Sequence, residues 1–436
     1  MMLELFYNFS LPFLDFLLRL FSFFIPRLKI FLQEREGLLE RWQLALAKIP
    51  KKNRIWFHVS SVGELEQIRP VMEQLQQKFS YQFIVSFYSP SVPRLVKDWS
   101  FVAYADYLPL DHWREMKLLT GWIFPKMLVL NRYDLWPNLL RAARENKIPI
   151  TLVNASTPPL GFGGWLSLWF RRSLFKKIYF WTFVDSVAAA AWEPYLRKDV
   201  QAFVAGNPRV DRALKRVDEA MKLGRTKKTL ELWKHDKKLC IVAGSTWEKE
   251  EELLLCALQN LRMQKEMDAV QLVIVPHEPY IEHVAHTKKL CEKYGFSVVL
   301  FSELTQAEKQ SHTDVLLVDA RGVLAEIYNE AAVAFVGGGF GRETHSIIEP
   351  LAHGVPAAIG PKHHRSPEAK TLSIMGGAFV VNSLSSTKEL AKWWQEILSN
   401  SEKAGRAKEA MKLYLSIHRG AGERVSDFLA ERIKID

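Results

Sequence analysis

A glycine-rich stretch and the residues after it have the composition of a nucleotide site. Three glycines follow an apolar run at 333–336; they are Gly337, Gly338 and Gly339. Because glycine has no Cβ, a phosphate can approach the main chain there, and a helix that starts near Thr344 would offer free N–H groups. On that helix His345 and Glu349 would share one face, where the carboxylate could hold ribose hydroxyls and the imidazole a phosphate or a base. The alternative is a tight turn followed by a capped helix.

A second candidate is the carboxylate of Glu64, in the sequence HVSSVGE at 58–64. The apolar run at 55–59 predicts a strand, and a helical pattern follows it. Ser61 and Gly63 therefore fall in the turn, and Glu64 falls in the first turn of the helix. A carboxylate in that position interacts favourably with the helix dipole. It could also act as a general base, so both interpretations stay open.

A third group of candidates lies in AGSTWEKEEELL, at 243–254. Gly244 would let the backbone approach a ligand, and Ser245 with Glu248 has the spacing of a capping box. Ser245 and Thr246 could also contact phosphate, because a helix N-terminus offers free N–H groups for either purpose.

Three further polar residues complete the candidates that the residues alone suggest. His277 and Glu278 follow an apolar run at 272–276, and parallel strands of open sheets present their carboxyl ends to ligands. Arg209, in AGNPRVD at 205–211, lies beside the expected junction of two domains. Arginine binds phosphate through two parallel hydrogen bonds, so Arg209 could clamp a phosphate.

Short apolar runs alternate with helical patterns along the chain, which predicts parallel sheets. The first series of expected strands is 55–59, 83–87, 127–130, 150–153 and 180–184. The second series is 239–244, 272–276, 298–301, 315–319, 333–337 and 355–360. We expect an α/β protein with two doubly wound domains, at 51–208 and 209–436, preceded by a segment at 1–50. Two such domains would form a cleft between the carboxyl ends of their strands.

The composition is that of a globular protein with an anionic partner. The chain has 436 residues, of which 48% are hydrophobic and 25% charged, and a formal net charge of +11. Such a charge suits a phosphorylated substrate or a membrane surface, whereas the aromatic residues fall in buried strands or an anchor, so a nucleic-acid partner is not expected. The three cysteines lack metal-ligand spacing, and no disulfide is expected.

Residues 3–25 are rich in Phe and Leu, but Glu4, Asp15 and Arg19 interrupt them, so a membrane-spanning helix is not expected. The apolar side chains have helical spacing: Phe6, Phe9, Phe13, Leu17, Leu20 and Phe24. Polar residues, among them Asn8, fall on the opposite side, which is typical of a helix lying in a membrane interface. A signal peptide fits less well because the basic residues follow the apolar stretch. The alternative is a helix packed on the protein's own core.

The ordered series of motifs resembles the Kdo transferases, membrane-associated glycosyltransferases of the GT-B fold. The matching motifs are HVSSVGE, DLWPN at 134–138, LVNAS at 152–156, AGNPRVD, AGSTWEKEEELL, VPHEP at 275–279, VAFVGGGFG at 333–341 and HSIIEP at 345–350. The family moves 3-deoxy-D-manno-octulosonic acid (Kdo) from CMP-Kdo to lipid A precursor. The resemblance implies an inverting displacement in lipopolysaccharide synthesis, no metal or other cofactor, and a peripheral or monotopic place on the cytoplasmic face of the inner membrane.

The resemblance also implies roles for matching residues. Glu64 resembles the family's general base, and Arg209 stands where the family has a lysine that stabilises the departing nucleotide. The positions that resemble its CMP contacts are His277, Glu278, Arg321, Gly322, Val323, Ser346, Ile347, Ile348 and Glu349.

The chain departs from the family pattern at the DLWPN motif. The family's ETELWPN reads NRYDLWPN here, so Arg132 replaces the leading glutamate and Asp134 alone keeps a carboxylate. Asp134 is therefore the second candidate for the base. Two other functions stay open: a glycosyltransferase that uses a UDP-sugar, and a non-catalytic relative that binds nucleotide or lipid.

Overall fold

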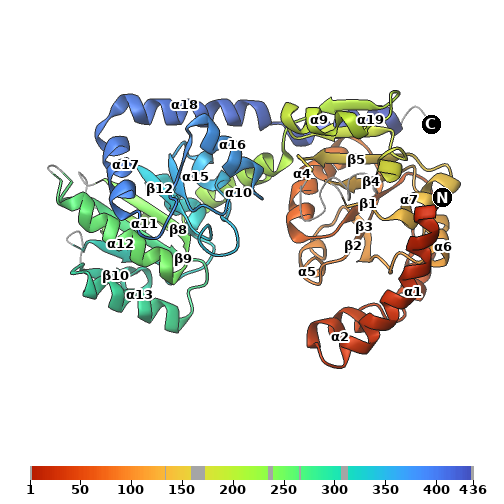
Figure 1. The fold of residues 1–436 in the computed structure, drawn as a ribbon, viewed down its shortest axis with the longest axis horizontal. Helices are drawn as coiled ribbons and strands as arrows, with labels where there is room; N and C mark the ends of the chain where they lie inside the picture. The colour runs from red at the N-terminus through yellow and green to blue at the C-terminus, as the bar shows by residue number, and fades with distance from the viewer. Residues whose placement is uncertain are drawn as a thin grey trace. The chain divides into compact units, whose positions relative to one another are not determined.

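The computed structural model describes residues 2–132, 134–158, 172–233, 239–264, 267–305 and 313–433. The chain divides into two compact units. The first unit is Met1–Arg212 with His418–Asp436, and the second is Ala213–Ile417. Each unit contains a parallel sheet with helices around it, as Figure 1 shows.

The sheet of the first unit has its central strand at β1. Its strands are β1 (Arg54–Val59), β2 (Gln82–Phe87), β3 (Val102–Tyr107), β4 (Met127–Asn131), β5 (Ile150–Ala155), β6 (Phe180–Phe183) and β7 (Gln201–Val204). They are ordered β3-β2-β1-β4-β5-β6-β7, and each neighbouring pair is parallel. The order reverses between β1 and β4, which is where open α/β sheets place their ligands.

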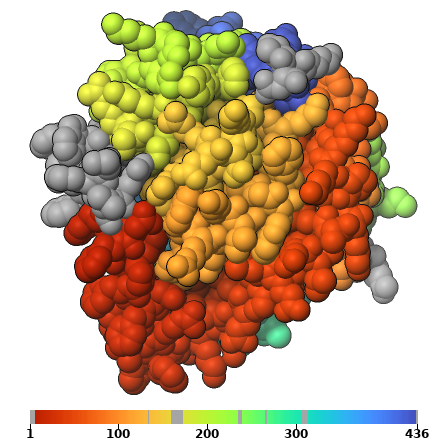
Figure 2. Space-filling view, turned by 90° about the vertical axis from the view of Figure 1, so that its right-hand side faces the viewer, coloured from red at the N-terminus to blue at the C-terminus, as the bar shows by residue number. Residues whose placement is uncertain are grey.

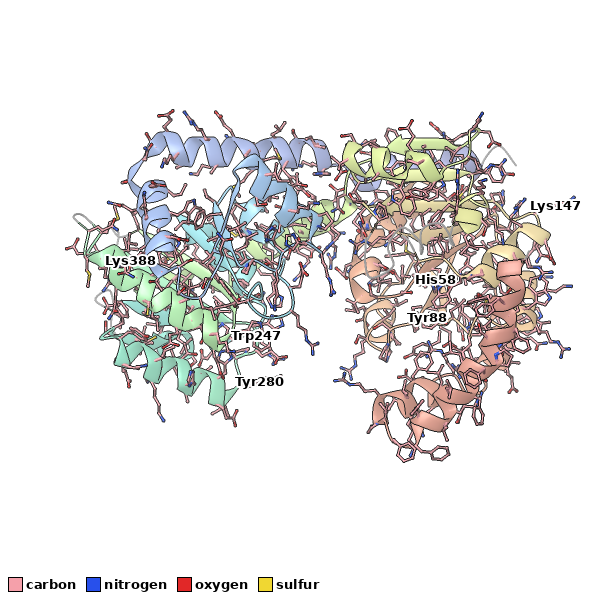
Figure 3. The ribbon with its side chains drawn as sticks, viewed as in Figure 1. His58, Tyr88, Lys147, Trp247, Tyr280 and Lys388 are labelled. Atoms are coloured by element: carbon pink, nitrogen blue, oxygen red, sulfur yellow. The ribbon has the colours of Figure 1, made fainter. Side chains whose placement is uncertain are left out.

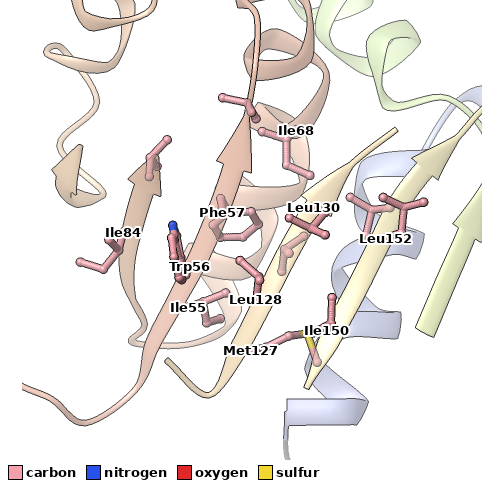
Figure 4. Packing of buried hydrophobic residues seen from close by; sticks show 14 of the residues in the cluster. Ile55, Trp56, Phe57, Ile68, Ile84, Met127, Leu128, Leu130, Ile150 and Leu152 are labelled. Atoms are coloured by element: carbon pink, nitrogen blue, oxygen red, sulfur yellow. The ribbon is translucent and has the colours of Figure 1, made fainter. Parts of the chain in front are cut away.

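The core of the first unit lies on both faces of β1, β4 and β5. Every residue of these three strands is buried, as expected for parallel strands that helices cover on both sides. Figure 4 shows Phe57, Leu128 and Leu152 among the side chains that pack between neighbouring strands. These continuous apolar runs are the reason that the sequence predicts the strands correctly.

Helices connect the strands of the first unit. They are α1 (Met2–Ser22), α2 (Pro26–Gln33), α3 (Leu38–Ala47), α4 (Val62–Lys78), α5 (Pro93–Val96), α6 (Trp113–Ile123), α7 (Pro137–Glu145), α9 (Ser186–Trp192) and α19 (Ala421–Ile433). Helix α10 (Pro208–Leu223) begins in the first unit and continues into the second.

The second unit repeats the architecture. Its strands are β8 (Cys240–Thr246), β9 (Gln271–Pro276), β10 (Val298–Leu300), β11 (Val315–Leu317), β12 (Val333–Val336), β13 (Ala357–Ile359) and β14 (Ala378–Val380), in the order β10-β11-β9-β8-β12-β13-β14. Its helices are α11 (Lys227–Trp233), α12 (Glu248–Arg262), α13 (Ile281–Lys293), α14 (Leu324–Ile327), α15 (Ile348–Ala352), α16 (Pro367–Met375), α17 (Thr387–Ser399) and α18 (Ser401–His418). The two sheets give the chain the GT-B fold expected from the sequence.

The C-terminal helix corrects the expected domain boundary. The sequence assigned all of 209–436 to the second domain, but α19 belongs to the first unit and packs against α4. Val425, Leu429 and Ile433 are buried in the first hydrophobic core, so the apolar face of α19 explains its position.

The buried guanidinium of Arg54 joins the N-terminal helices to the sheet. Arg54 is 1% exposed at the start of β1 and donates only to backbone carbonyls among the described residues. Its acceptors include Leu46 O at the end of α3, at 2.8 Å, and Trp122 O and Ile123 O at the end of α6, at 2.9 and 3.0 Å. The cation thus lies at the negative ends of two helix dipoles.

Helix α1 docks on the first unit by a polar face. The Tyr7 hydroxyl donates to Asp111 Oδ2 at 3.0 Å, and Asn138 Nδ2 donates to Asn8 Oδ1 at 2.6 Å. Asn8, which the sequence placed toward water, therefore contacts protein. The phenylalanines of the expected stripe are instead exposed: Phe6, Phe9, Phe13 and Phe24 are 64–84% exposed. In the part of the chain that was searched, no helix is long and apolar enough to cross a membrane.

Candidate active site

Glu64 lies where the sequence predicts it, in the first turn of α4 directly after the central strand. Ser61 is the N-cap, and its hydroxyl accepts a hydrogen bond from Glu64 N at 3.3 Å. The Glu64 carboxylate is 8% exposed, and its Oε2 accepts from Ser60 N at 2.6 Å. The helix start and the turn together fix the carboxylate at the carboxyl end of β1. Gly63 is the second residue of α4.

Asp134 lies beside this turn and contacts two residues of the β1 strand and turn. The Ser60 hydroxyl donates to Asp134 Oδ2, and His58 Nε2 lies 2.9 Å from the same oxygen. His58 is fully buried on β1, and its ring lies edge to face with Tyr88, 6.3 Å between centroids. Figure 3 labels both rings in the first unit.

The two carboxyl groups have opposite pKa shifts. Burial raises the pKa of Glu64, and the charge of Asp134 raises it further against the hydrogen bond from Ser60. Burial alone would raise the pKa of Asp134, but the hydrogen bond and charge of His58 bring it below its usual value. Neighbouring carboxyl groups with separated pKa values can act as a base and a permanent anion.

Buried amides hold the backbone of α4 in place. Asn131, at the end of β4, donates from Nδ2 to Glu64 O at 3.0 Å. Asn154 Nδ2 donates to Asn131 Oδ1 at 2.9 Å, so the second amide orients the first. The sequence analysis missed both asparagines, although a polar residue at the end of an apolar strand was the signal that could have revealed them.

A further amide connects α4 to the segment that carries Arg209. Gln67 Nε2 donates to Asn207 Oδ1 at 3.0 Å, and the same oxygen accepts from Arg209 N at 3.1 Å. Arg209 is therefore part of the first unit, on the first turn of α10. Arg132, which replaces the family glutamate, has a left-handed backbone with φ of 62°, and its charge lowers the pKa of Glu64.

The second unit contains a pocket of about 440 Å³ that gathers many of the predicted nucleotide contacts. The predicted residues that line it are Ser245, His277, Glu278, Arg321, Gly322 and Glu349. Arg216, which the sequence analysis did not select, also lines the pocket. Its Nη2 lies 3.6 Å from Glu349 Oε1. Burial raises the pKa of Glu349, and the charge of Arg216 opposes that shift.

Three aromatic rings lie beside this pocket, of which His277 and His345 are stacked and Trp247 is tilted. The rings of His277 and His345 are 3.9 Å apart at 16°, and Trp247 lies 5.2 Å from His277. Trp247 Nε1 donates to His345 Nε2 at 3.3 Å, so that nitrogen is unprotonated. Burial and the neighbouring His277 lower the pKa of His345 to about 4, which keeps the ring neutral.

The backbone of the glycine loop, which the sequence predicted to face a phosphate, makes hydrogen bonds within the second unit. Both Glu250 oxygens accept from Gly338 N, at 2.9 and 3.0 Å, and Gly337 N donates to Gly244 O. A Cβ on Gly338 would meet Glu343 O at 2.4 Å, so internal packing explains this glycine. Gly339 likewise packs closely against backbone.

The helix after the glycine loop starts later than predicted. Helix α15 begins at Ile348, so His345 and Ser346 precede it and do not share a helical face with Glu349. Ile347 and Ile348 are buried at 1% and 2% exposure, which makes them core residues.

Corrections also apply to AGSTWEKEEELL. Ser245 is in β8 with φ of 55°, and α12 begins at Glu248 with Trp247 as its N-cap, so Ser245 does not form the expected capping box. Glu250 makes that contact instead, accepting from Trp247 N at 3.2 Å. A Cβ on Gly244 would meet the Tyr328 hydroxyl at 2.2 Å, so a buried tyrosine occupies the space predicted for a ligand.

Thr246 supports the fold from a buried cluster around Glu251. Its Oγ1 donates to Glu251 Oε1 at 2.8 Å, and His283 Nε2 lies 3.0 Å from that oxygen. His283 Nδ1 lies 3.0 Å from Glu278 O, so both ring nitrogens face acceptors. The hydrogen bond to Glu251 raises the pKa of His283 against the effect of burial. Val323 is also buried, at 6% exposure.

Comparisons with known proteins show what the chain is similar to. A family model described as 3-deoxy-D-manno-octulosonic-acid transferase (kdotransferase) matches residues 32–212. A 3-deoxy-D-manno-octulosonic acid transferase of Haemophilus influenzae is 27% identical over 409 residues, which are 93% of this chain and 92% of the relative. The chain is thus similar to the Kdo transferases over most of its length.

Other Kdo transferase relatives and solved structures extend the match. The 3-deoxy-D-manno-octulosonic acid transferase of Aquifex aeolicus is 28% identical over 354 residues, or 80% of this chain and 87% of the relative. The UDP-GlcNAc 2-epimerase of Neisseria meningitidis, solved with UDP-GlcNAc, has a TM-score of 0.60 at 14% identity and covers 88% of this chain and 100% of its own. At that identity the structure shows only that this chain shares the two-domain fold.

Proposed function

We propose that this chain is an inverting glycosyltransferase that moves Kdo from CMP-Kdo to lipid A precursor in lipopolysaccharide synthesis. The observation that carries the proposal is the Glu64 carboxylate, buried in the family motif and bonded through Oε2 to Ser60 N. No hydrogen bond to Oε1 is found among the described residues, which leaves this oxygen for an acceptor hydroxyl.

In the proposed reaction an acceptor hydroxyl oxygen attacks the anomeric carbon of Kdo while the bond to the phosphate oxygen of CMP breaks. Glu64 takes the hydroxyl proton, and CMP leaves with the bonding electrons. The raised pKa of Glu64 supports this role, because a base is most effective when its pKa approaches the working pH.

We assign the donor to the pocket of the second unit. Glu349 would hold the ribose hydroxyls, and Arg216 and Arg321 would bind the anionic groups of the donor. Arg216 would bind phosphate in addition to Arg209, the phosphate ligand expected from the sequence. No metal ion or other cofactor enters the proposed chemistry, because arginine side chains would compensate the charge on the leaving phosphate.

We also propose that the protein acts on the cytoplasmic face of the inner membrane, as a peripheral or monotopic protein. Helix α1 leaves Phe9 84% exposed and Phe13 64% exposed, and Figure 2 shows the N-terminal segment on the surface of the first unit. Exposed phenylalanines of an amphipathic helix enter the interface between headgroups and acyl chains. The net charge of +11 favours an anionic lipid surface and the phosphates of lipid A precursor.

The test is a transfer assay with purified protein, tetraacyl lipid A precursor, and a panel of CMP- and UDP-sugars, with the products identified by mass. The expected product carries Kdo, at a rate that depends on CMP-Kdo. Transfer from a UDP-sugar alone would mean that the donor is a UDP-sugar and not CMP-Kdo. A protein that binds nucleotide but neither transfers sugar nor hydrolyses the donor would be a non-catalytic relative.

A further inference from the structure

Three buried side chains, Trp56, Ser86 and His58, form a hydrogen-bonded series, and the last of them contacts the partly exposed Asp134. Trp56 and His58 lie on the same face of β1, and Ser86 is the register partner of His58 on β2. Trp56 Nε1 donates to Ser86 Oγ at 2.8 Å, and Ser86 Oγ lies 2.8 Å from His58 Nδ1. His58 Nε2 then lies 2.9 Å from Asp134 Oδ2.

This arrangement fixes the tautomer of His58. The Ser86 oxygen accepts from Trp56, and the one acceptor found for the Ser86 hydroxyl hydrogen in the described residues is His58 Nδ1. His58 Nδ1 is therefore unprotonated in the neutral ring, and the ring hydrogen is on Nε2, the nitrogen that lies 2.9 Å from Asp134 Oδ2. Trp56, His58 and Ser86 are fully buried, so water does not compete for these bonds.

Ser60 connects Asp134 to Glu64. Its hydroxyl donates to Asp134 Oδ2, while its backbone N–H donates to Glu64 Oε2 at 2.6 Å. We propose that His58 is a positioning residue for the transfer reaction: its Nε2–H holds Asp134 against the Ser60 hydroxyl, and Ser60 in turn holds the carboxylate of Glu64. This inference rests on the proposed role of Glu64 as the base. It assigns the histidine that begins HVSSVGE the role of positioning that base.

Several charged and titratable groups surround His58 and Asp134. His58 lowers the pKa of Asp134, Glu64 and Asp111, and Arg132 lowers that of Glu64. Tyr88 faces His58 across its ring edge and has a pKa raised by burial, so it stays neutral at ordinary pH. Loss of His58 removes the hydrogen bond that stabilises the Asp134 carboxylate, and Asp134 would then protonate at higher pH.

The test compares His58→Leu with His58→Gln in the transfer assay. His58→Leu is expected to lower kcat roughly 10- to 150-fold, the effect of one charge-assisted hydrogen bond, with KM for both substrates within about twofold. His58→Gln keeps an N–H donor near the position of Nε2 and is expected to recover most of the loss. The acid limb of the rate profile should move to higher pH in His58→Leu.

A double-mutant cycle with Asp134→Asn separates positioning from packing. If His58 acts through Asp134, His58→Leu costs little in the Asp134→Asn background and no longer moves the acid limb. An equal loss of kcat in both backgrounds, without a pH shift, would overturn the proposal. His112→Leu, at the start of α6, is the matched control and should leave kcat unchanged.

The cycle is also measured by urea unfolding of the same four proteins, which does not depend on transfer. If the stabilities show coupling between His58 and Asp134, the contact between them is supported. If the unmodified protein also transfers no sugar, the proposed function is refuted independently of that contact. If His58→Leu does not fold, His58→Gln in both backgrounds gives the same comparison. Absence of coupling in an active protein would refute the positioning role alone.

Discussion

The carboxylate of Glu250 accepts the backbone N–H of Gly338 through both oxygens, at 2.9 and 3.0 Å. It also accepts from Phe340 N at 3.2 Å and from Trp247 N at 3.2 Å. A side chain of α12 therefore occupies the N–H groups that a phosphate would have used. The glycine loop is a structural joint between β12 and α12.

Glu250→Ala should consequently destabilise the second unit. The substitution leaves buried N–H groups without an acceptor, which costs about 1–3 kcal/mol for each group. Urea unfolding measures this loss, and Lys249→Ala, an exposed neighbour on α12, should stay within about 0.5 kcal/mol of the unmodified protein. Equal stability of the two variants would contradict the structural role of Glu250.

Glu64→Gln should abolish most of the transfer activity. Glutamine is nearly isosteric but cannot take a proton near neutral pH, and loss of a general base typically lowers the rate about 100- to 10,000-fold. The rate at saturating donor and the melting temperature are measured on one preparation. Near-normal turnover with a small loss of stability would show that Glu64 only stabilises the start of the helix. Asp134 would then be the next candidate for the base.

Glu349→Ala should weaken CMP binding without affecting the acceptor. Loss of a charge-assisted hydrogen bond to ribose would reduce affinity roughly 10- to 150-fold. Titration calorimetry with CMP measures the change. Glu389→Ala, an exposed carboxylate on α17, is the control and should bind CMP normally. Normal CMP affinity in a folded Glu349→Ala protein would assign this residue to structure.

The pair of His283 and Glu251 should make the stability of the second unit depend on pH. The pKa of His283 in the folded state is raised by its hydrogen bond to Glu251, above the unfolded value of about 6.5. Its stabilising contribution is thus complete below about pH 6.5 and is lost as pH rises through the folded pKa. Urea midpoints at several pH values should show this loss in the unmodified protein and not in His283→Gln. Parallel profiles would contradict the assignment.

Substitution of three exposed phenylalanines should release the protein from anionic vesicles. The triple variant Phe9→Ser, Phe13→Ser and Phe16→Ser removes phenylalanines that are 60–84% exposed. Burying a phenylalanine contributes about 1.5–3 kcal/mol, so vesicle co-sedimentation should fall at least roughly tenfold. These substitutions keep Tyr7 and Asn8, whose contacts a deletion of the helix would remove.

The control for the vesicle experiment is a matched triple variant in the second unit. Met263→Ser, Ile281→Ser and Ile374→Ser remove side chains that are 77–85% exposed. Their vesicle binding should equal that of the unmodified protein. Equal losses in both triple variants would show that α1 has no special affinity for the membrane.

The sequence predicts the central strands well because they are buried on both faces. Continuous apolar runs such as IWFHV and FIVSF are typical of parallel strands that helices cover on both faces. Two edge strands of the first sheet, β3 and β7, were not predicted, whereas the edge strand β10 of the second sheet was. Every residue of β7 is exposed and β3 is only half-buried at its start, so neither has the burial on both faces that gives the central strands their long apolar runs.

The site was predictable where local structure decides it. Glu64 follows from a strand, a serine cap and a helix that are adjacent in the chain, and the structure places it accordingly. The contact between Gly338 and Glu250 was not predicted because the two residues are 88 positions apart in sequence. Arg216 was missed because a basic residue on a charged helix has no distinguishing pattern.

The position of Arg54 has a mechanical consequence. Its side chain joins the ends of α3 and α6, while its backbone opens β1, the strand that leads to His58 and Ser60. A pull on α3 would thus reach the start of β1 through this guanidinium as well as through the main chain. A lysine could not join the two helices in this way, because one ammonium group cannot span both helix ends.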